Sequence, residues 1–201
     1  VSVSISGGEM ATGIFIFVLG LTGFRDNFRL MLQNGLSRRT MFFSYAATAL
    51  ALSAGLSLLV NLINVCGKLL FAGHPNIVFT YTTEMMYAGR YADGAGQMQI
   101  FTESFLFFFC LYASIMAGGY LITTVFYRLS RAGKIAVGVA VPAFFIFVLP
   151  IFDGLVAGGR ISMFLFTTIT KAFGLYHTQN PFIAMGSCLF TFALFSGLEW
   201  L

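Results

Sequence analysis

The uncharged stretch Ser104–Tyr127, SFLFFFCLYASIMAGGYLITTVFY, decides the class of this protein. A helix needs about 20 consecutive apolar residues to cross a bilayer, and this stretch is long enough. The whole chain of 201 residues has the same character, because 58% of it is hydrophobic and 9% is charged. Soluble domains carry about 25% charged residues. The composition therefore excludes a soluble enzyme, a disordered chain, a nucleic-acid-binding module and a disulfide-rich scaffold.

Similar charge-free runs elsewhere predict further membrane spans. The predicted spans are residues 4–24, 40–65, 104–127, 135–152 and 181–201. Pro142 lies inside the fourth span and removes a backbone hydrogen bond there, so we expect a kink. The predicted fold class is all-α, a polytopic membrane helix bundle that forms a single transmembrane domain over residues 1–201.

The links between these spans differ in basic charge. The two short links, residues 25–39 and 128–134, carry seven Lys and Arg residues, and the two longer links, residues 66–103 and 153–180, carry four. Cytoplasmic loops of membrane proteins are enriched in Lys and Arg. We therefore expect the short links in the cytoplasm and the long links outside.

The second long link contains an apolar run of its own, Ile161–Thr170 or ISMFLFTTIT. Ten residues are too few to cross a bilayer, which predicts a re-entrant or interfacial helix in an outer segment over about residues 158–176. Gly154, Gly158 and Gly159 allow the chain to turn just before it. An ordinary outer loop with apolar residues is the alternative.

The first basic link, Phe24–Thr40 or FRDNFRLMLQNGLSRRT, has a helical pattern. Side chains of one kind recur three or four positions apart, with Phe24, Phe28 and Met31 on one face and Arg25, Arg29 and Gln33 on the next. This spacing predicts a short amphipathic helix over about residues 25–36. Asn34-Gly35 favours a helix stop, and Ser37 favours an N-cap for the following span.

Arg38 and Arg39 fall in the first turn of that following span. The helix dipole disfavours cations there, so local helix stability does not explain these residues. Two interpretations remain open. The link is either a positively charged cytoplasmic anchor, or a cytoplasmic helix that docks into a cleft of a soluble partner.

The chain carries no sequence motif for catalysis, metal or nucleotide binding. HExxH, GxSxG and the phosphate-binding GxxxxGK[ST] do not occur, and Cys66, Cys110 and Cys188 are widely spaced. We predict no catalytic, cofactor-binding or metal-binding residue in this chain. Glu9 and Glu103 are expected near the outer ends of spans, close to water.

The run Phe24–Thr40 resembles the equivalent segment in permease subunits of bacterial ABC-2 type transporters. The order of elements is also similar to that family: a span, a cytoplasmic coupling helix, three more spans, an apolar re-entrant outer link and a last span. Six spans are usual in the family, with the coupling helix between the second and the third. The resemblance implies that the first span precedes Val1, since the chain does not begin with Met.

The resemblance implies the permease of an ATP-driven transporter in the bacterial plasma membrane, exporting a hydrophobic or amphipathic compound or peptide. This chain would not itself be an enzyme, because ATP and Mg would bind a separate ATP-binding cassette subunit. A second permease, identical or related, would complete a dimer in the lipid bilayer, with no nucleic acid as a partner. The expected contacts to the ATPase subunit are Arg25, Asp26, Phe28, Arg29, Gln33, Arg38 and Arg39. The expected lining of the transport path includes Phe17, Pro142 and Phe145.

Two other classes of function remain open. One is a non-transporting multi-pass membrane protein, such as an immunity, scaffold or sensor subunit. The other is an intramembrane enzyme that uses Glu84, His74 or Glu103. Carriers coupled to protons or sodium usually place carboxylates at mid-membrane, and none is expected on the path here.

Overall fold

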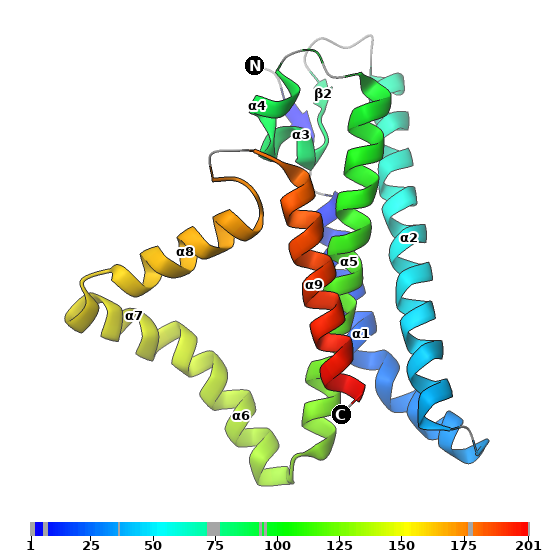
Figure 1. The fold of residues 1–201 in the computed structure, drawn as a ribbon, viewed down its shortest axis with the longest axis vertical. Coiled ribbons are helices and arrows are strands. Elements are labelled where there is room, and N and C mark those ends of the chain that lie inside the picture. Colours follow the sequence, from blue (N-terminus) through cyan, green and yellow to red (C-terminus); the bar gives the residue numbers. More distant parts are fainter. Residues whose placement is uncertain are drawn as a thin grey trace.

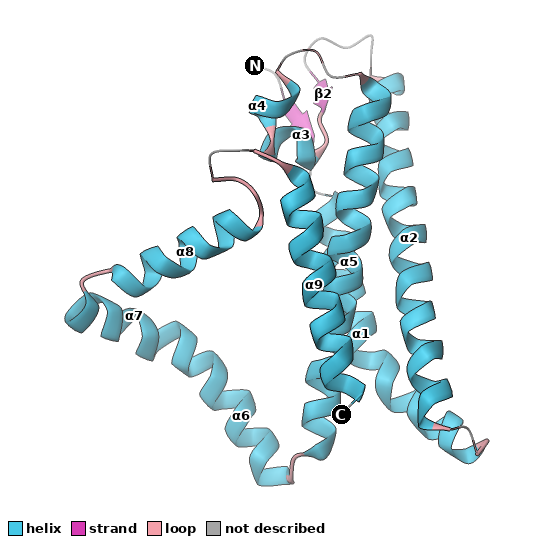
Figure 2. Ribbon diagram, in the orientation of Figure 1, coloured by secondary structure: helices cyan, strands magenta, loops and turns pink. Residues whose placement is uncertain are grey.

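The computed structural model of the protein describes residues 3–5, 8–35, 37–71, 77–92, 94, 96–176 and 179–200. The side chains of residues 3–5, 24–32, 38, 77–79 and 157 lie outside this description. The described part is almost entirely helical (Figure 2). Its helical stretches that are long and apolar enough to cross a membrane are Arg39–Leu70, Gln97–Arg128, Arg131–Val156 and Pro181–Trp200. The protein is therefore a membrane-embedded helical bundle, as its composition predicts.

Helix α5 (Gln97–Arg128) is the centre of the bundle. Three other helices pack against it: α1 (Gly8–Gln33), α2 (Arg38–Leu70) and α9 (Pro181–Trp200) (Figure 1). Phe107, Tyr112 and Met116 of α5 belong to the buried core that these neighbours enclose. The helix is apolar on nearly all sides, which suits a membrane helix whose sides face either other helices or lipid.

Two glycines let α1 and α5 approach each other closely. A Cβ atom on Gly119 would lie 2.7 Å from the carbonyl oxygen of Phe17, and one on Gly20 would lie 2.5 Å from the carbonyl oxygen of Met116. Any side chain at either position would have to displace backbone. Small residues at a membrane helix crossing permit this close packing.

The start of α2 agrees with the sequence prediction. The Oγ atom of Ser37 accepts a hydrogen bond from the backbone N–H of Thr40 at 3.2 Å, as an N-cap residue does. The preceding Gly35 has a φ of 68°, a conformation that glycine adopts at little cost. The helix then runs to Leu70, beyond the predicted end at residue 65.

The predictions for the first span and the amphipathic helix were wrong in their boundaries. Residues 3–5 form strand β1 (Val3–Ile5), which pairs in parallel with β2 (Ile77–Phe79), so the predicted start at residue 4 is incorrect. The apolar part of α1, Gly8–Gly23, is short for a span. Helix α1 also continues unbroken to Gln33, and residues 25–33 are not a separate helix. Between Gly23 and Gln33 the sequence holds neither Gly nor Pro, so the change from apolar to basic side chains does not stop the helix.

The predicted fourth span is a continuous helix that stands beside the bundle. Its segments are α6 (Arg131–Ala143), η1 (Phe144–Val148), α7 (Leu149–Phe152) and η2 (Asp153–Ala157). It is longer at both ends than the predicted 135–152. Pro142 does not end it; the backbone instead changes to π-helical hydrogen bonding at Phe144–Val148, where the N–H of Leu149 donates to the carbonyl oxygen of Phe144.

Helix α8 (Arg160–Ala172) lies inside the outer segment predicted over residues 158–176. Gly158 and Gly159 make the turn before it with φ angles of 58° and 82°, as predicted. Gly154, the third predicted turn residue, instead lies inside η2. The buried carboxylate of Asp153 accepts hydrogen bonds from the N–H groups of Ile161 and Ser162 at 2.8 and 3.0 Å, and from the Ser162 hydroxyl. Asp153 therefore caps α8 and holds the turn.

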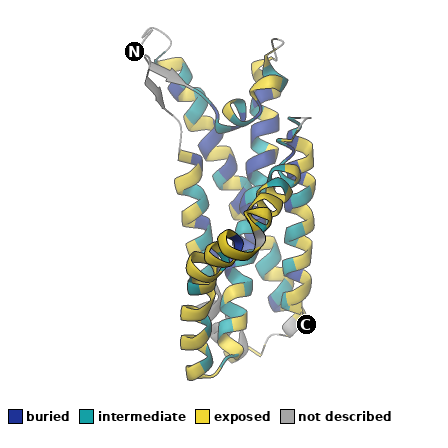
Figure 3. Cartoon of the chain, turned by 90° about the vertical axis from the view of Figure 1, so that its left-hand side faces the viewer, coloured by how far each residue is buried: buried dark blue, intermediate teal, exposed yellow. Residues whose placement is uncertain are grey.

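Together the helices from Arg131 to Ala172 form an arm, which is the name we use for them. Figure 1 shows the arm leaving the lower end of α5, turning beside the bundle and returning to the upper end of α9. Its side chains are almost all exposed (Figure 3). The arm therefore packs on the rest of the described chain only near its two ends.

The two ends of the bundle differ in structure. At the upper end in Figure 1, β2, α3 (Thr82–Met86) and α4 (Ala88–Tyr91) form a cap over the ends of α2, α5 and α9. At the lower end α1 turns into α2, and α5 turns into α6. The two basic links thus lie at one end, as predicted, and the link over residues 66–103 lies at the other.

Candidate functional site

The basic end of the bundle holds the residues predicted to contact an ATPase subunit. Figure 1 shows the last turns of α1 running away from the bundle and lying beneath the start of α2. Gln33, which ends α1, and Arg39, in the first turn of α2, are exposed. Arg25, Asp26, Phe28 and Arg29 belong to the same last turns and Arg38 begins α2, but their side chains lie outside the described ones.

The second basic link adds further cations to this end. Arg128 ends α5, and Arg131 and Lys134 begin α6; all three side chains are exposed. Ser130 connects the two helices, and its Oγ atom accepts a hydrogen bond from the N–H of Gly133 at 3.2 Å. This end therefore presents positive charge that suits anionic lipid headgroups or an acidic protein surface.

The structure does not bring the three predicted path residues together. Phe17 is half-buried on α1, where its backbone faces Gly119 of α5. Pro142 and Phe145 lie on the arm with exposed side chains, away from α1 (Figure 1). Within one chain they are apart because the arm diverges from the bundle at Ser130 (Figure 1).

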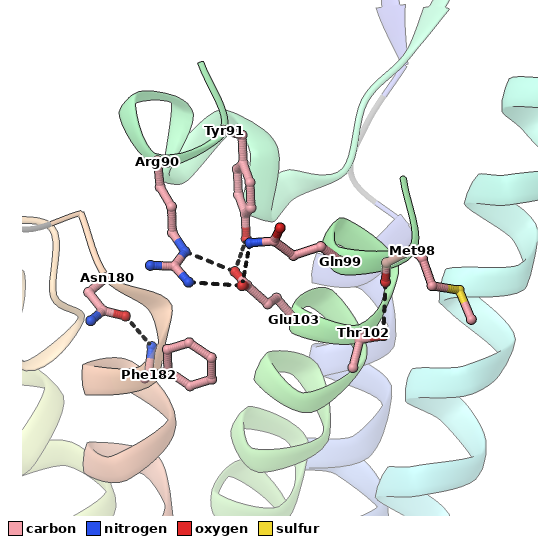
Figure 4. A network of polar contacts seen from close by, with 8 residues as sticks. All are labelled: Arg90, Tyr91, Met98, Gln99, Thr102, Glu103, Asn180 and Phe182. Atoms are coloured by element: carbon pink, nitrogen blue, oxygen red, sulfur yellow. Dashed lines mark hydrogen bonds and ion pairs between the residues drawn. The ribbon is translucent and has the colours of Figure 1, made fainter. Parts of the chain in front are cut away.

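At the opposite end, an ion-pair network fastens the cap to α5 (Figure 4). The Nε and Nη2 atoms of Arg90 in α4 donate to the two carboxylate oxygens of Glu103 in α5 at 3.0 and 2.9 Å. The Tyr91 hydroxyl and the Gln99 amide also donate to Glu103, at 2.8 and 3.0 Å. Glu103 is 6% exposed, so the expectation that it lies close to water was wrong.

This network also reaches α9. The Arg90 guanidinium lies over the ring of Phe182, 5.3 Å from its centroid, and the N–H of Gly89 donates to Gln179 Oε1 at 2.6 Å. The hydrogen bond to Glu103 raises the pKa of Arg90, and burial together with the bond to Glu103 raises the pKa of Tyr91. The cap thus connects α5 to α9.

A second set of contacts holds the cap to α2 and to Phe173, the residue that follows the arm. Lys68 Nζ lies 2.8 Å from a carboxylate oxygen of Glu84, which also accepts from the N–H of Tyr81 at 3.0 Å. The buried Tyr87 hydroxyl donates to the carbonyl oxygen of Phe173 at 2.6 Å, and burial raises the pKa of Tyr87 to about 12. Glu84 and Glu103, two residues of the enzyme hypothesis, are therefore engaged in structural contacts, while His74 lies outside the described residues.

Within the bundle, one face of α2 carries buried polar side chains. Ser57 donates to the carbonyl oxygen of Phe105 at 2.8 Å, and Asn64 donates to Glu9 Oε1 at 2.8 Å. The Tyr112 hydroxyl donates to the backbone oxygen of Glu9 at 2.9 Å. Glu9 is 2% exposed, so its predicted place near water was also wrong. These three contacts pair polar groups between helices, where lipid offers them no partner.

Comparisons of the chain with protein families, with curated proteins and with solved structures found no match. Its function must therefore be argued from its own residues.

Sequence reasoning missed one acidic residue, Glu199, in the last turn of α9. Both of its carboxylate oxygens are buried and accept no hydrogen bond from the described residues. Tyr45 of α2 and Tyr120 of α5 are close enough to interact with it electrostatically. A signal was available: Glu199 follows the small residues Ser196 and Gly197 on a helix that is otherwise free of charge. Such a residue is a functional candidate by default.

Proposed function

We propose that this chain is the membrane-spanning permease of an ATP-driven transporter of the ABC-2 type, in which a separate subunit binds ATP and Mg. The observation that carries the proposal is the basic extension of α1, residues 25–33, which continues a membrane helix past its apolar part and lies under the start of α2 (Figure 1). Force applied to this extension would reach the bundle directly, because no break separates it from Gly8–Gly23. The exposed basic side chains at the same end of the bundle suit an acidic cleft on the ATPase subunit.

The arm supports the same proposal. The apolar helical stretch Arg131–Val156 is 26 residues long, and its most apolar part is entirely unburied. This surface is therefore free to contact a second permease copy or a hydrophobic cargo. We propose that the complex is a dimer of permeases in the bacterial plasma membrane, with the basic end in the cytoplasm and the cap outside. The cargo would be a hydrophobic or amphipathic compound or peptide that is exported.

The decisive experiment is purification of the natural full-length chain from its own membranes, followed by identification of co-purifying proteins. An ATPase subunit is expected, and it is expected to be lost when Arg25 and Arg29 are both changed to Glu. The matched control reverses Arg131 and Lys134, which carry the same charge at the same end but lie on the arm. ATPase retained in the control and lost in the first variant would assign the contact to the α1 extension.

Two outcomes would contradict the proposal. One is recovery of the protein without any ATPase and without ATP-dependent transport in liposomes. The other is equal loss of the ATPase in both charge-reversed variants, because the basic end would then act only through its total charge. Function that survives the reversal of Arg25 and Arg29 would favour the non-transporting alternative, an immunity, scaffold or sensor subunit.

A further inference from the structure

Glu199 lies at the meeting point of three helices near the basic end of the bundle. It belongs to the last turn of α9, and it interacts with Tyr45 of α2 and Tyr120 of α5. The next residue on α9, Trp200, packs edge-on against Phe42 of α2 with ring centroids 5.2 Å apart. This aromatic contact holds the end of α9 against α2, next to the carboxyl group of Glu199.

No described group stabilises a negative charge on Glu199. Neither carboxylate oxygen accepts a hydrogen bond, and neither ion pair of the described part includes this residue. The single hydroxyl proton of Tyr45 is committed to the carbonyl oxygen of Met116 at 3.0 Å, and its ring stacks on Tyr120 with centroids 3.6 Å apart. One turn earlier on α9, the buried Ser196 hydroxyl also lacks a hydrogen-bond partner among the described residues.

The size of the site restricts what can bind there. Both carboxylate oxygens are closed off from solvent, so a metal ion with its ligand shell or an organic amine would have to open the bundle to reach them. A proton requires no space. An unpaired, ionised carboxylate in an apolar interior is strongly unfavourable, and such a group takes up a proton instead. We propose that Glu199 is a proton-binding site that is occupied, and therefore neutral, at neutral pH.

Among the side chains that the structure describes, no charged group at this end pairs with Glu199. Tyr45 of α2 and Tyr120 of α5 are the described titratable side chains close enough to interact with it electrostatically, and tyrosine ordinarily carries no charge at neutral pH. Arg39 and Arg128 have exposed side chains and form no ion pair with it. Release of the proton would place a charge between α2, α5 and α9 and would loosen their contact. The inference does not depend on an ATPase partner, because it rests on burial within this chain alone.

Infrared spectroscopy tests the proposal directly, because neutral and ionised carboxyl groups absorb at different frequencies. The full chain in lipid nanodiscs at neutral pH is expected to show the band of a neutral carboxyl group. That band is expected to disappear as the pH rises and to be lost in Glu199→Gln. The matched control is Glu103→Gln, which removes an ion-paired carboxylate of the same bundle and is expected to leave the band unchanged.

The wild-type protein alone can overturn the inference. If it shows no neutral carboxyl band at neutral pH, Glu199 is ionised and the proposal fails, whether or not the variants fold. A band that survives in Glu199→Gln, or that disappears in Glu103→Gln, would assign the proton to another residue and would equally refute it. Loss of the band in Glu199→Gln alone would establish the site.

Discussion

Arg90 and Glu103 form a bidentate ion pair with nitrogen–oxygen distances of 3.0 and 2.9 Å. The pair joins α4, a short helix of the cap, to the central membrane helix α5. Guanidinium and carboxylate are matched in shape, so the pair fixes orientation as well as distance. Because Arg90 also lies over Phe182, one side chain connects α4, α5 and α9. The capped end of the bundle is therefore held firmly, whereas the arm is attached only near its ends.

The first prediction concerns this ion pair. Glu103→Gln leaves the half-buried Arg90 without its counter-charge and weakens the hydrogen bonds between them, so the free energy of unfolding should fall by about 1.5 kcal/mol. Denaturant unfolding in detergent measures the change. Thr102→Ala is the control, because exposed Thr102 bonds only to a carbonyl oxygen of its own helix, and it should cost less than about 0.5 kcal/mol. Equal costs for the two variants would show that the network adds no stability.

The second prediction concerns pH and Tyr87. Burial raises its pKa from the usual 10.0 to about 12, so the folded protein holds the phenol proton more tightly than the unfolded chain does. The free energy of unfolding should therefore decrease as the pH rises from 10 to 12, and then level off. Tyr87→Phe should be about 1 kcal/mol less stable at neutral pH, because it lacks the hydrogen bond to Phe173.

Comparison of the two proteins isolates the contribution of Tyr87, since the other tyrosines are present in both. The pH dependence of Tyr87→Phe between pH 10 and 12 should be shallower than that of the wild type. Parallel stability curves over this range would contradict the prediction.

The third prediction concerns the crossing of α1 and α5. Gly119→Ala places a methyl group against the backbone of Phe17, which must shift, so we expect a loss of about 2–3 kcal/mol of stability. Gly55→Ala on α2 is the control, because nothing lies within 4 Å of the position of its new Cβ atom. It should be neutral or stabilising by up to about 1 kcal/mol, since alanine favours helix more than glycine does. A tolerated Gly119→Ala would show that the two helices do not approach as closely as the structure describes.

The fourth prediction concerns the cap of α8. Asp153→Ala removes the acceptor of the N–H groups of Ile161 and Ser162, so these two amides should exchange with solvent faster than in the wild type. Ser162→Ala keeps both backbone bonds and removes only the hydroxyl contact, so its effect should be smaller. Hydrogen exchange followed by mass spectrometry measures both variants. Unchanged exchange in Asp153→Ala would mean that another group caps the helix.

Local features were predicted well because they depend on neighbours in the chain. Ser37 caps α2, and Gly158 and Gly159 turn the chain before α8, since caps and turns need only a few adjacent residues. The pattern after Gly23 predicted helical backbone correctly but gave the wrong boundary. A change in the chemical nature of the side chains does not interrupt a helix whose backbone has no reason to stop.

Contacts between distant segments were not predictable in the same way. Glu9 and Glu103 lie near the ends of helices, where sequence position suggests water, yet a helix from elsewhere or the cap covers them. The close approach at Gly20 and Gly119 depends on how α1 and α5 are rotated relative to each other. The arm diverges from the bundle because its helices pack on the rest of the described chain only near the two ends of the arm. The local sequence pattern does not show which helices pack together.

Composition and pattern alone predict that this protein is embedded in a membrane, that it is built of helices, and that its basic links lie at one end. Apolar length and the placement of Lys and Arg suffice for these conclusions, because they are properties of transfer between water and lipid. Packing between distant segments, by contrast, brings Arg90 to Glu103, leaves the arm beside the bundle, and encloses the carboxyl group of Glu199. Whether a polar side chain is buried and paired depends on the surfaces that pack around it, and those surfaces come from segments far away in the chain.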